Sequence, residues 1–207
     1  MVPPQPQSHP IYTTPEEYLE LDRHSPVRFE YVDGVAYALA GGTLNHSEIS
    51  LNLAELLRVQ LRQLRQLRSA DGGDCEVYNS DARVRLSASR YVYPDLTISC
   101  DARDQGTSDI LTAPRVALEV LSPSTESTED YDRGAKFALY RACPTVQEYV
   151  LVASERQSVE VFRRGDAGGD AWTLHTFGLG DVVELSSVGN GGIRFAVADV
   201  YASVTVE

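Results

Sequence analysis

Two apolar runs in the middle of the chain decide its fold: Tyr91-Val-Tyr-Pro-Asp-Leu-Thr-Ile-Ser99 and Arg115-Val-Ala-Leu-Glu-Val-Leu121. Their β-branched and aromatic residues are typical of buried strands, and each run contains one acidic residue, Asp95 or Glu119. A carboxylate in an apolar strand loses solvation, so it must be paired, protonated or bound to a cation. Neighbouring strands lie about 4.8 Å apart, close enough for the two acids to hold one divalent metal ion. The alternative is that both carboxylates are structural.

Outward from these runs, the pattern alternates between helices and further strands. Apolar residues at helical spacing predict a long helix from Asn45 to Leu67, and a second helix is expected from Asp130 to Arg141. An Asp-Gly pair at 33–34 lies between two alternating runs and predicts a tight hairpin. Further strands are expected near residues 75–78, 82–86, 148–153, 159–164, 172–177 and 182–185. We therefore expect an α/β (α+β) fold, in which helices flank a mixed sheet with hairpins at its periphery.

The chain is long enough for one domain and short for two. Residues 1–13 contain four prolines among polar residues, which predicts a flexible arm. Thr14-Pro-Glu-Glu17 has the residues of a capped helix start, and this short helix is expected to end near Leu21. We therefore place a single domain at 14–207.

Cysteine content and hydropathy limit the class of protein. The three cysteines, Cys75, Cys100 and Cys143, are odd in number and widely spaced, so neither a disulfide framework nor a zinc site is predicted. No apolar run approaches the ~20 residues of a membrane span. We expect a protein of the reducing cytoplasm, without a membrane segment.

The formal net charge of −12 argues against nucleic-acid binding, which usually needs a basic surface. One basic feature nevertheless stands out in the long predicted helix. Arginines at 58, 62, 65 and 68 form a stripe beside its apolar face. The ordinary interpretation of such a stripe is a solvated helix face. The more specific interpretation is a face that contacts nucleic-acid phosphates.

Several short blocks together resemble a known bacterial family, the Uma-two family of "putative restriction endonucleases", which is placed in the PD-(D/E)XK nuclease superfamily. The likeness covers roughly residues 15–200 and includes His46. The blocks that carry it are Phe29-Glu-Tyr-Val-Asp-Gly34, Ser80-Asp-Ala-Arg-Val84, Tyr93-Pro-Asp95, Glu119-Val-Leu-Ser-Pro-Ser-Thr125, Tyr131-Asp-Arg-Gly-Ala-Lys136 with Tyr140, and Gln147-Glu-Tyr-Val-Leu-Val152. The resemblance implies a restriction-endonuclease-like fold, a Mg²⁺ or Mn²⁺ cofactor and DNA as the substrate.

The resemblance also extends to three residues that the pattern alone leaves open. Glu30 lies on a hairpin strand and could equally face solvent. His46 is in the first turn of the long helix, where a histidine is usually a surface or capping residue. Asp81 precedes a strand and is either a second metal ligand or an ordinary turn aspartate. The resemblance favours site roles for all three.

The superfamily pattern places a lysine two residues after the glutamate, and in this chain that position is Leu121. Lys136 is the candidate replacement, because it is the only lysine among eighteen basic residues. An ammonium that can lose a proton differs chemically from a guanidinium that cannot, although chance could also leave a single lysine. Asp132, Lys136 and Tyr140 match the helix motif of the family. We expect the Lys136 amine to point toward Asp95 and Glu119.

Three functions remain open at this stage. The first is a magnesium-dependent DNA endonuclease, which the paired carboxylates favour. The second is a catalytically degenerate member that binds a partner or forms a homo-oligomer, which the acidic charge favours. The third, a glycosidase, would need a sugar-sized groove lined with aromatic residues, and an aromatic content of 8% does not support it.

Overall fold

The computed structural model describes residues 10–67, 74–122, 131–165, 170–189 and 191–206. It contains two six-stranded mixed sheets and a two-stranded sheet. The first sheet has the order β1 (Ile11–Tyr12), β3 (Val35–Ala38), β2 (Phe29–Val32), β6 (Arg90–Val92), β5 (Arg83–Ser87), β8 (Ile110–Leu111). The second has the order β12 (Trp172–Gly178), β11 (Ser158–Arg164), β10 (Glu148–Ala153), β9 (Pro114–Leu121), β7 (Leu96–Ser99), β4 (Glu76–Asn79). Strands β13 (Val182–Leu185) and β14 (Ile193–Ala196) form the small sheet.

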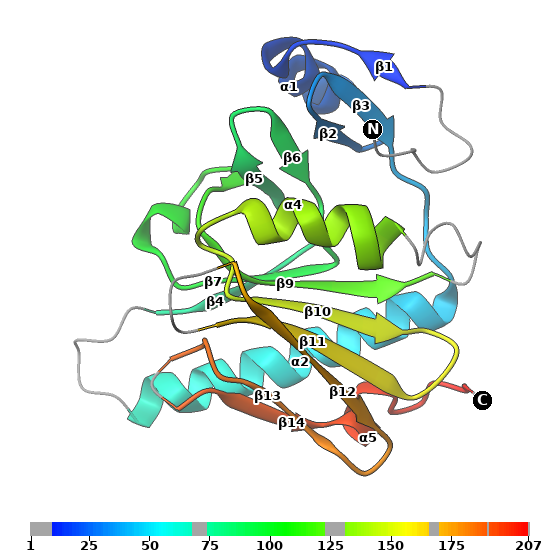
Figure 1. Cartoon of the computed structure of the whole chain (residues 1–207), viewed down its shortest axis with the longest axis vertical. Coiled ribbons are helices and arrows are strands. Elements are labelled where there is room, and N and C mark those ends of the chain that lie inside the picture. The colour runs from blue at the N-terminus through cyan, green and yellow to red at the C-terminus, as the bar shows by residue number, and fades with distance from the viewer. Residues whose placement is uncertain (1–9, 68–73, 123–130, 166–169, 190, 207) are drawn as a thin grey trace.

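Two helical layers cover the second sheet from opposite sides, and Figure 1 shows the strands between them. On one side, α2 (Leu44–Leu67) buries Leu53 and Leu57 in a cluster with Leu118 and Val120 of β9. On the other side, α4 (Phe137–Ala142) buries Tyr140 in a cluster with Leu121. Side chains alternate along a strand, so Glu119 shares the α4 side of β9 with Leu121. The expected α+β sandwich with a mixed sheet is confirmed.

The first sheet packs against the short helix α1 (Pro15–His24). Its N-terminus has a complete capping box, in which Glu17 N donates to Thr14 Oγ1 and Thr14 N donates to a carboxylate oxygen of Glu17. Tyr18 of α1 stacks on Tyr31 of β2, with ring centroids 4.9 Å apart, and the hairpin at Asp33-Gly34 forms as predicted. The helix ends at His24, three residues later than expected, and the chain returns through Ser25 into β2.

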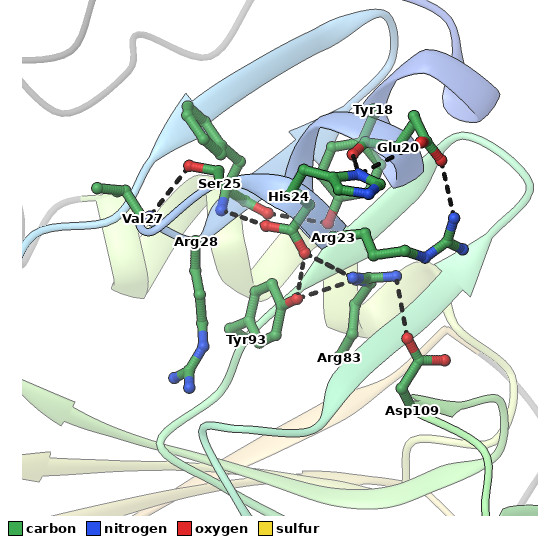
Figure 2. A network of polar contacts seen from close by, with 12 residues as sticks. Tyr18, Glu20, Arg23, His24, Ser25, Val27, Arg28, Arg83, Tyr93 and Asp109 are labelled. Carbon is green, nitrogen blue, oxygen red and sulfur yellow. Dashed lines mark hydrogen bonds and ion pairs between the residues drawn. The ribbon is translucent and has the colours of Figure 1, made fainter.

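A buried polar network joins α1 to the strands of this sheet (Figure 2). Arg83 of β5 donates to Asp22 Oδ2 through Nη2 at 2.6 Å, and Asp22 Oδ1 accepts from Phe29 N at 2.8 Å. The Tyr93 hydroxyl donates to Asp22 and accepts from Arg83 Nε at 2.9 Å. The Asp22 and Arg83 side chains are only 2% and 6% exposed. They form a buried ion pair, in which each charge neutralises the other where water does not reach. The network fixes Phe29 and Tyr93, which lie beside the candidate site.

Local structure differs from the expectations at several points. Ile11 and Tyr12 of the expected flexible arm form β1, while residues 1–9 lie outside the described residues. The helix expected over 130–141 begins as a π-helix, Tyr131–Lys136, and continues as α4 to Ala142; residue 130 is not described. The connection between the two central strands, for which no element is expected above, contains a 3₁₀ turn, Ala102–Asp104, and β8. Near the C-terminus, where no element is expected above, the strand β14 is followed by α5 (Val197–Val200).

The expectation that no disulfide forms is wrong. Cys75 and Cys100 are bonded to each other, and their Cα atoms are 3.9 Å apart. The antiparallel register of β4 and β7 pairs Glu76 with Ser99, so the residues just beyond each strand end face one another. The cysteine pattern therefore no longer supports the expectation of a reducing compartment.

A membrane span requires a helix of a certain length and hydropathy. Over the described ranges, no helix combines the length and the apolar character needed to cross a bilayer.

Candidate active site

Strand pairing brings the two predicted carboxylates together. Strands β7 and β9 are antiparallel, with Leu96 opposite Leu118, and one further step of this register places Asp95 opposite Glu119. Asp95 has left the ladder, and its Oδ2 accepts a hydrogen bond from Val120 N at 2.7 Å. Glu119 is 5% exposed on β9. Both side chains line the same cavity, as the sequence predicts for a shared site.

Lys136 reaches this site from the segment that covers β9. Its Nζ lies 2.9 Å from Glu119 Oε1 and 3.2 Å from Glu30 Oε1, and the residue is 6% exposed. Tyr140, four residues further along, donates its hydroxyl to the same Glu119 oxygen at 2.7 Å. Two donors from one helical segment therefore fix the orientation of the Glu119 carboxylate, and the Lys136 amine points toward it as expected.

Glu30 is buried, at 4% exposure, and does not face solvent. It lies on β2, and its Oε1 accepts from Tyr93 N at 3.1 Å in addition to contacting Lys136. Tyr93 is held in turn by the Asp22–Arg83 network of Figure 2. The first sheet thus contributes one acid to a site that is otherwise built on the second sheet.

His46 approaches Asp95 from the other side of the sheet. It lies in the first turn of α2, where its N–H donates to Thr43 Oγ1 at 3.2 Å. Its Nε2 is 3.2 Å from Asp95 Oδ2, and both side chains are less than one-fifth exposed. Gly42 leaves room for the ring, because a Cβ there would lie 2.8 Å from His46 Cγ and Nδ1. A close backbone approach therefore holds the imidazole against Asp95.

The electrostatic balance of this cluster is negative. Burial raises the pKa of Glu119 well above its usual range; Lys136 opposes this rise, whereas Asp95, Asp132 and Glu30 add to it. Burial alone would lower the pKa of Lys136, but Glu119 and Glu30 outweigh it, so the pKa is raised and the ammonium persists. His46 behaves in the same way, because its contact with Asp95 outweighs burial and raises its pKa. Four neighbouring carboxyl groups exceed the available cations, so a bound cation would stabilise the ionised site.

The cavity at these residues has a volume of about 780 Å³. Its lining includes Asp95, Glu119, Asp132 and Lys136 and residues from the first turns of α2. The lining also includes Arg28, whose guanidinium contacts the Tyr93 ring and donates to the carbonyl of Ser80. A cavity of this size and polarity can admit a charged substrate to the carboxylates.

The chain matches known proteins along most of its length. The model of the Uma2 family, described as "Putative restriction endonuclease", matches residues 15–198. The chain belongs to the Uma2 family.

Two uncharacterized proteins of Synechocystis sp. are similar to this Uma2 chain. One is 39% identical over 189 residues, covering 91% of this chain and 90% of the relative, and the other is 29% identical over 164 residues, covering 78% and 85%. A crystal structure of a "putative nuclease belonging to DUF820" from Anabaena variabilis superposes with a TM-score of 0.69 at 17% identity, covering 93% of this chain and 99% of that one. At that identity, the likeness shows a common fold.

The structure bears on two positions singled out from the sequence, the candidate metal ligand Asp81 and the motif-lysine position Leu121. Asp81 is 67% exposed in its side chain, is bound to Arg28 and to Asn79, and does not line the cavity. It orients Arg28, which lines the cavity, and its own carboxylate is engaged there, so we leave it out of the metal set. Leu121 is 2% exposed within the apolar cluster under α4, where a lysine would be costly to bury without a partner.

Sequence reasoning missed the supporting residues of the site. In the sequence, Tyr93 stood out only as part of Tyr-Pro-Asp. In the structure, its backbone N–H donates a hydrogen bond to Glu30. Asp22 and Arg83, which hold Tyr93, are 61 residues apart in sequence and gave no local signal. Arg28 likewise carried no pattern, because its partners at 80, 81 and 93 are distant in the chain.

The carboxylate oxygens of Asp95 and Glu119 suit an ion such as Mg²⁺, which keeps most of its waters, better than a metal that needs three or four side-chain ligands. Within the described residues, no group of three or more His, Cys, Asp or Glu side chains is arranged to hold an ion. Asp95 Oδ1 and Glu119 Oε2 accept no hydrogen bond from that part of the chain, because the described hydrogen bonds use the other oxygen of each group. Mg²⁺ commonly needs only one or two carboxylates and keeps several waters. The two free oxygens therefore fit such an ion.

Proposed function

We propose that this Uma2 chain is a divalent-metal-dependent DNA endonuclease with a PD-(D/E)XK-type site. Asp95 and Glu119 hold Mg²⁺ or Mn²⁺, and Lys136 supplies the cation that the usual motif places at the Leu121 position. The observation that carries the proposal is the 2.9 Å contact between Lys136 Nζ and Glu119 Oε1 inside a cavity shared with Asp95.

Each residue has a chemical task that follows from its contacts. A bound divalent cation would polarise a phosphoryl oxygen and stabilise the departing alkoxide. Lys136 positions the attacking water and stabilises negative charge in the transition state, since it is charged, buried and fixed by two carboxylates. Tyr140 orients Glu119, and His46 orients Asp95, each by contacting one oxygen and leaving the other free.

Glu30 acts through Lys136. It lies 3.2 Å from the amine and receives the Tyr93 N–H, so it fixes both the charge and the position of the lysine. In the usual motif, the lysine at the Leu121 position would bring its ammonium group from strand β9 itself. Here it comes from a helical segment across the sheet face, with the same target carboxylate.

A nuclease assay tests the proposal. Purified protein should cut plasmid DNA in Mg²⁺ or Mn²⁺, lose the activity in EDTA, and lose it after Glu119→Gln. The matched control is Glu184→Gln, which changes an acid on β13 that pairs with Arg194 at the surface. Metal-dependent cutting that survives in Glu119→Gln would defeat the assignment.

A second candidate is a catalytically degenerate family member that binds a partner or assembles with itself. The acidic net charge of −12 favours it, because a DNA-binding protein usually presents a basic surface. The two candidates differ in one measurement. The degenerate protein would bind no divalent ion at Asp95 and Glu119 and would leave plasmid DNA intact at every metal concentration.

A further inference from the structure

Two arginines on the outer surface of α2 form no ion pair with an acid in the described part of the chain. Arg58 and Arg62 are exposed and four residues apart, and neither forms an ion pair or side-chain hydrogen bond with the described residues. Arg65, the next arginine of the stripe, differs, because its guanidinium contacts Glu76 at 2.6 Å and Asp74 at 3.1 Å. The stripe identified from the sequence therefore divides into a neutralised end and an uncompensated pair; Arg68 is outside the described residues.

The pair lies on one helix of an acidic chain. The protein has 30 acidic residues for 18 basic ones, so carboxylate partners are abundant. Like charges four residues apart on a helix repel one another and destabilise it slightly. The repulsion between Arg58 and Arg62 is therefore not relieved within the described protein. An anion bound between them would relieve it.

The pair is continuous with the wall of the active-site cavity. Ser47, Leu51 and Ala54 of α2 line that cavity. Arg58 is eleven residues beyond Ser47, which is about three helical turns, so both residues lie on one face of the helix. Arg58 and Arg62 line a second hollow of about 240 Å³ together with Leu61, Arg65 and Glu76. One face of α2 thus leads from the carboxylates to the unpaired guanidinium groups.

We propose that DNA entering the active-site cavity continues along this face of α2, with Arg58 and Arg62 binding phosphates of its backbone. The inference rests on the proposed function and places the substrate on the protein surface. The cavity lining holds three carboxylates, which repel phosphates, so cations outside the cavity would add to the affinity for DNA. A guanidinium matches a phosphate with two parallel donors, and the acid that lines the same hollow, Glu76, is already paired with Arg65.

The helix geometry sets the distance between this contact and the scissile bond. At ~1.5 Å per residue, Arg58 is roughly 16 Å along the axis from Ser47. A duplex advances ~3.4 Å per base pair, so, with the scissile bond beside Ser47, the phosphates held by Arg58 and Arg62 lie about five to seven base pairs from the cut. A duplex that ends closer to the cleavage position does not reach them.

Binding measured against salt tests the proposal. Fluorescein-labelled DNA duplexes of 8 and 24 base pairs are titrated in Mg²⁺ with the Glu119→Gln protein, which keeps the DNA intact. Arg58→Gln/Arg62→Gln is compared with Arg141→Gln/Arg156→Gln, which removes the same charge from two exposed arginines that line neither cavity. On the 24-base-pair duplex, the first variant should bind about tenfold more weakly per arginine at 0.1 M salt, with a salt slope reduced by about two.

The control variant should bind like the parent, and the difference between the variants should shrink on the 8-base-pair duplex. Equal affinity and slope in Arg58→Gln/Arg62→Gln, or an equal loss in the control, would overturn the inference. Its failure is distinct from failure of the proposed function. Wild-type protein that cuts DNA regardless of Arg58 and Arg62 disproves the DNA path alone, whereas protein that binds through these arginines without cutting in any metal disproves the nuclease alone.

Discussion

Lys136 Nζ and Glu119 Oε1 lie 2.9 Å apart, although one residue belongs to a helical segment and the other to the central strand beneath it. Lys136→Ala should lower nuclease activity by about 10² to 10³, the usual cost of removing one preorganised donor. Lys136→Arg should lose nearly as much, because a planar guanidinium cannot occupy the place of a compact ammonium between two carboxylates. Initial rates of plasmid cleavage measure both.

The control for Lys136 is Arg141→Ala, which removes a cation from the exposed surface of α4. Metal binding should be kept in Lys136→Ala, so a calorimetric titration separates loss of chemistry from loss of the ion. Full activity in Lys136→Ala would contradict the assignment.

Asp95→Ala and Glu119→Ala should each abolish the binding of Mg²⁺ or Mn²⁺ to the isolated protein. The reason is that each supplies one free carboxylate oxygen to a site with few protein ligands. Isothermal titration calorimetry measures the binding. Asp81→Ala should bind the ion as wild type does, since its carboxylate is engaged by Arg28 and does not line the cavity. Unchanged binding in both acid variants would show that the ion, if any, binds elsewhere.

Gly42→Ala should reduce activity by about 10- to 100-fold, the order expected when a site group is displaced by an ångström. The added Cβ would lie 2.8 Å from two atoms of the His46 ring and would force the imidazole away from Asp95. Gly41→Ala is a close control, because no atom lies within 4 Å of a Cβ at that position. Cleavage rates that fall equally in the two variants would point to the loop backbone and not to His46.

Asp22→Ala should lower the free energy of unfolding by about 3–5 kcal/mol, because it leaves a buried guanidinium and a tyrosine hydroxyl without their partner. Arg83 and Tyr93 are the groups left behind. Urea unfolding followed by circular dichroism measures the change. Arg23→Ala, which breaks an exposed pair with Glu20 one residue along the helix, should cost at most about 1 kcal/mol. A loss in Asp22→Ala no greater than that control would contradict the role given to the network.

Reducing the Cys75–Cys100 disulfide should lower the free energy of unfolding by about 3.5 kcal/mol, as expected for a loop of this length. The two cysteines are 25 residues apart. Unfolding with and without reductant measures the change, and Cys75→Ser/Cys100→Ser should be insensitive to reductant. Three reactive thiols in the denatured, unreduced protein would disprove the bond, whereas one thiol, from Cys143, is expected.

Local pattern was sufficient for the elements that have one clear periodicity. The strands around Asp95 and Glu119, the helix α2 and the Asp33-Gly34 hairpin follow from side-chain alternation, helical spacing and turn chemistry within a few residues. The direction of Lys136 followed from its chemistry as the only lysine together with a family resemblance. Its exposure and its distance from Glu119 could come only from the packed fold.

What failed depends on residues that meet across long stretches of chain. The disulfide depends on the register between β4 and β7. The position of Tyr93 depends on Asp22 and Arg83. The ion pair between Asp81 and Arg28 joins residues that precede two different strands. The π-helix over 131–136 was also invisible, because its residues have no spacing that distinguishes it from an α-helix. Sequence separation, and not weak propensity, was the obstacle in most of these cases.

The antiparallel alignment of Asp95 with Glu119 has a consequence for insertions and deletions. A one-residue slip between β7 and β9 would turn one acid to the opposite face of the sheet, so these strands cannot gain or lose a residue and keep the site. The connection between them runs from 100 to 113, at the far end from both acids, and its length is free of that constraint. Homologous chains should therefore vary in length in this connection while the count of residues from Asp95 to Ser99 and from Pro114 to Glu119 stays fixed.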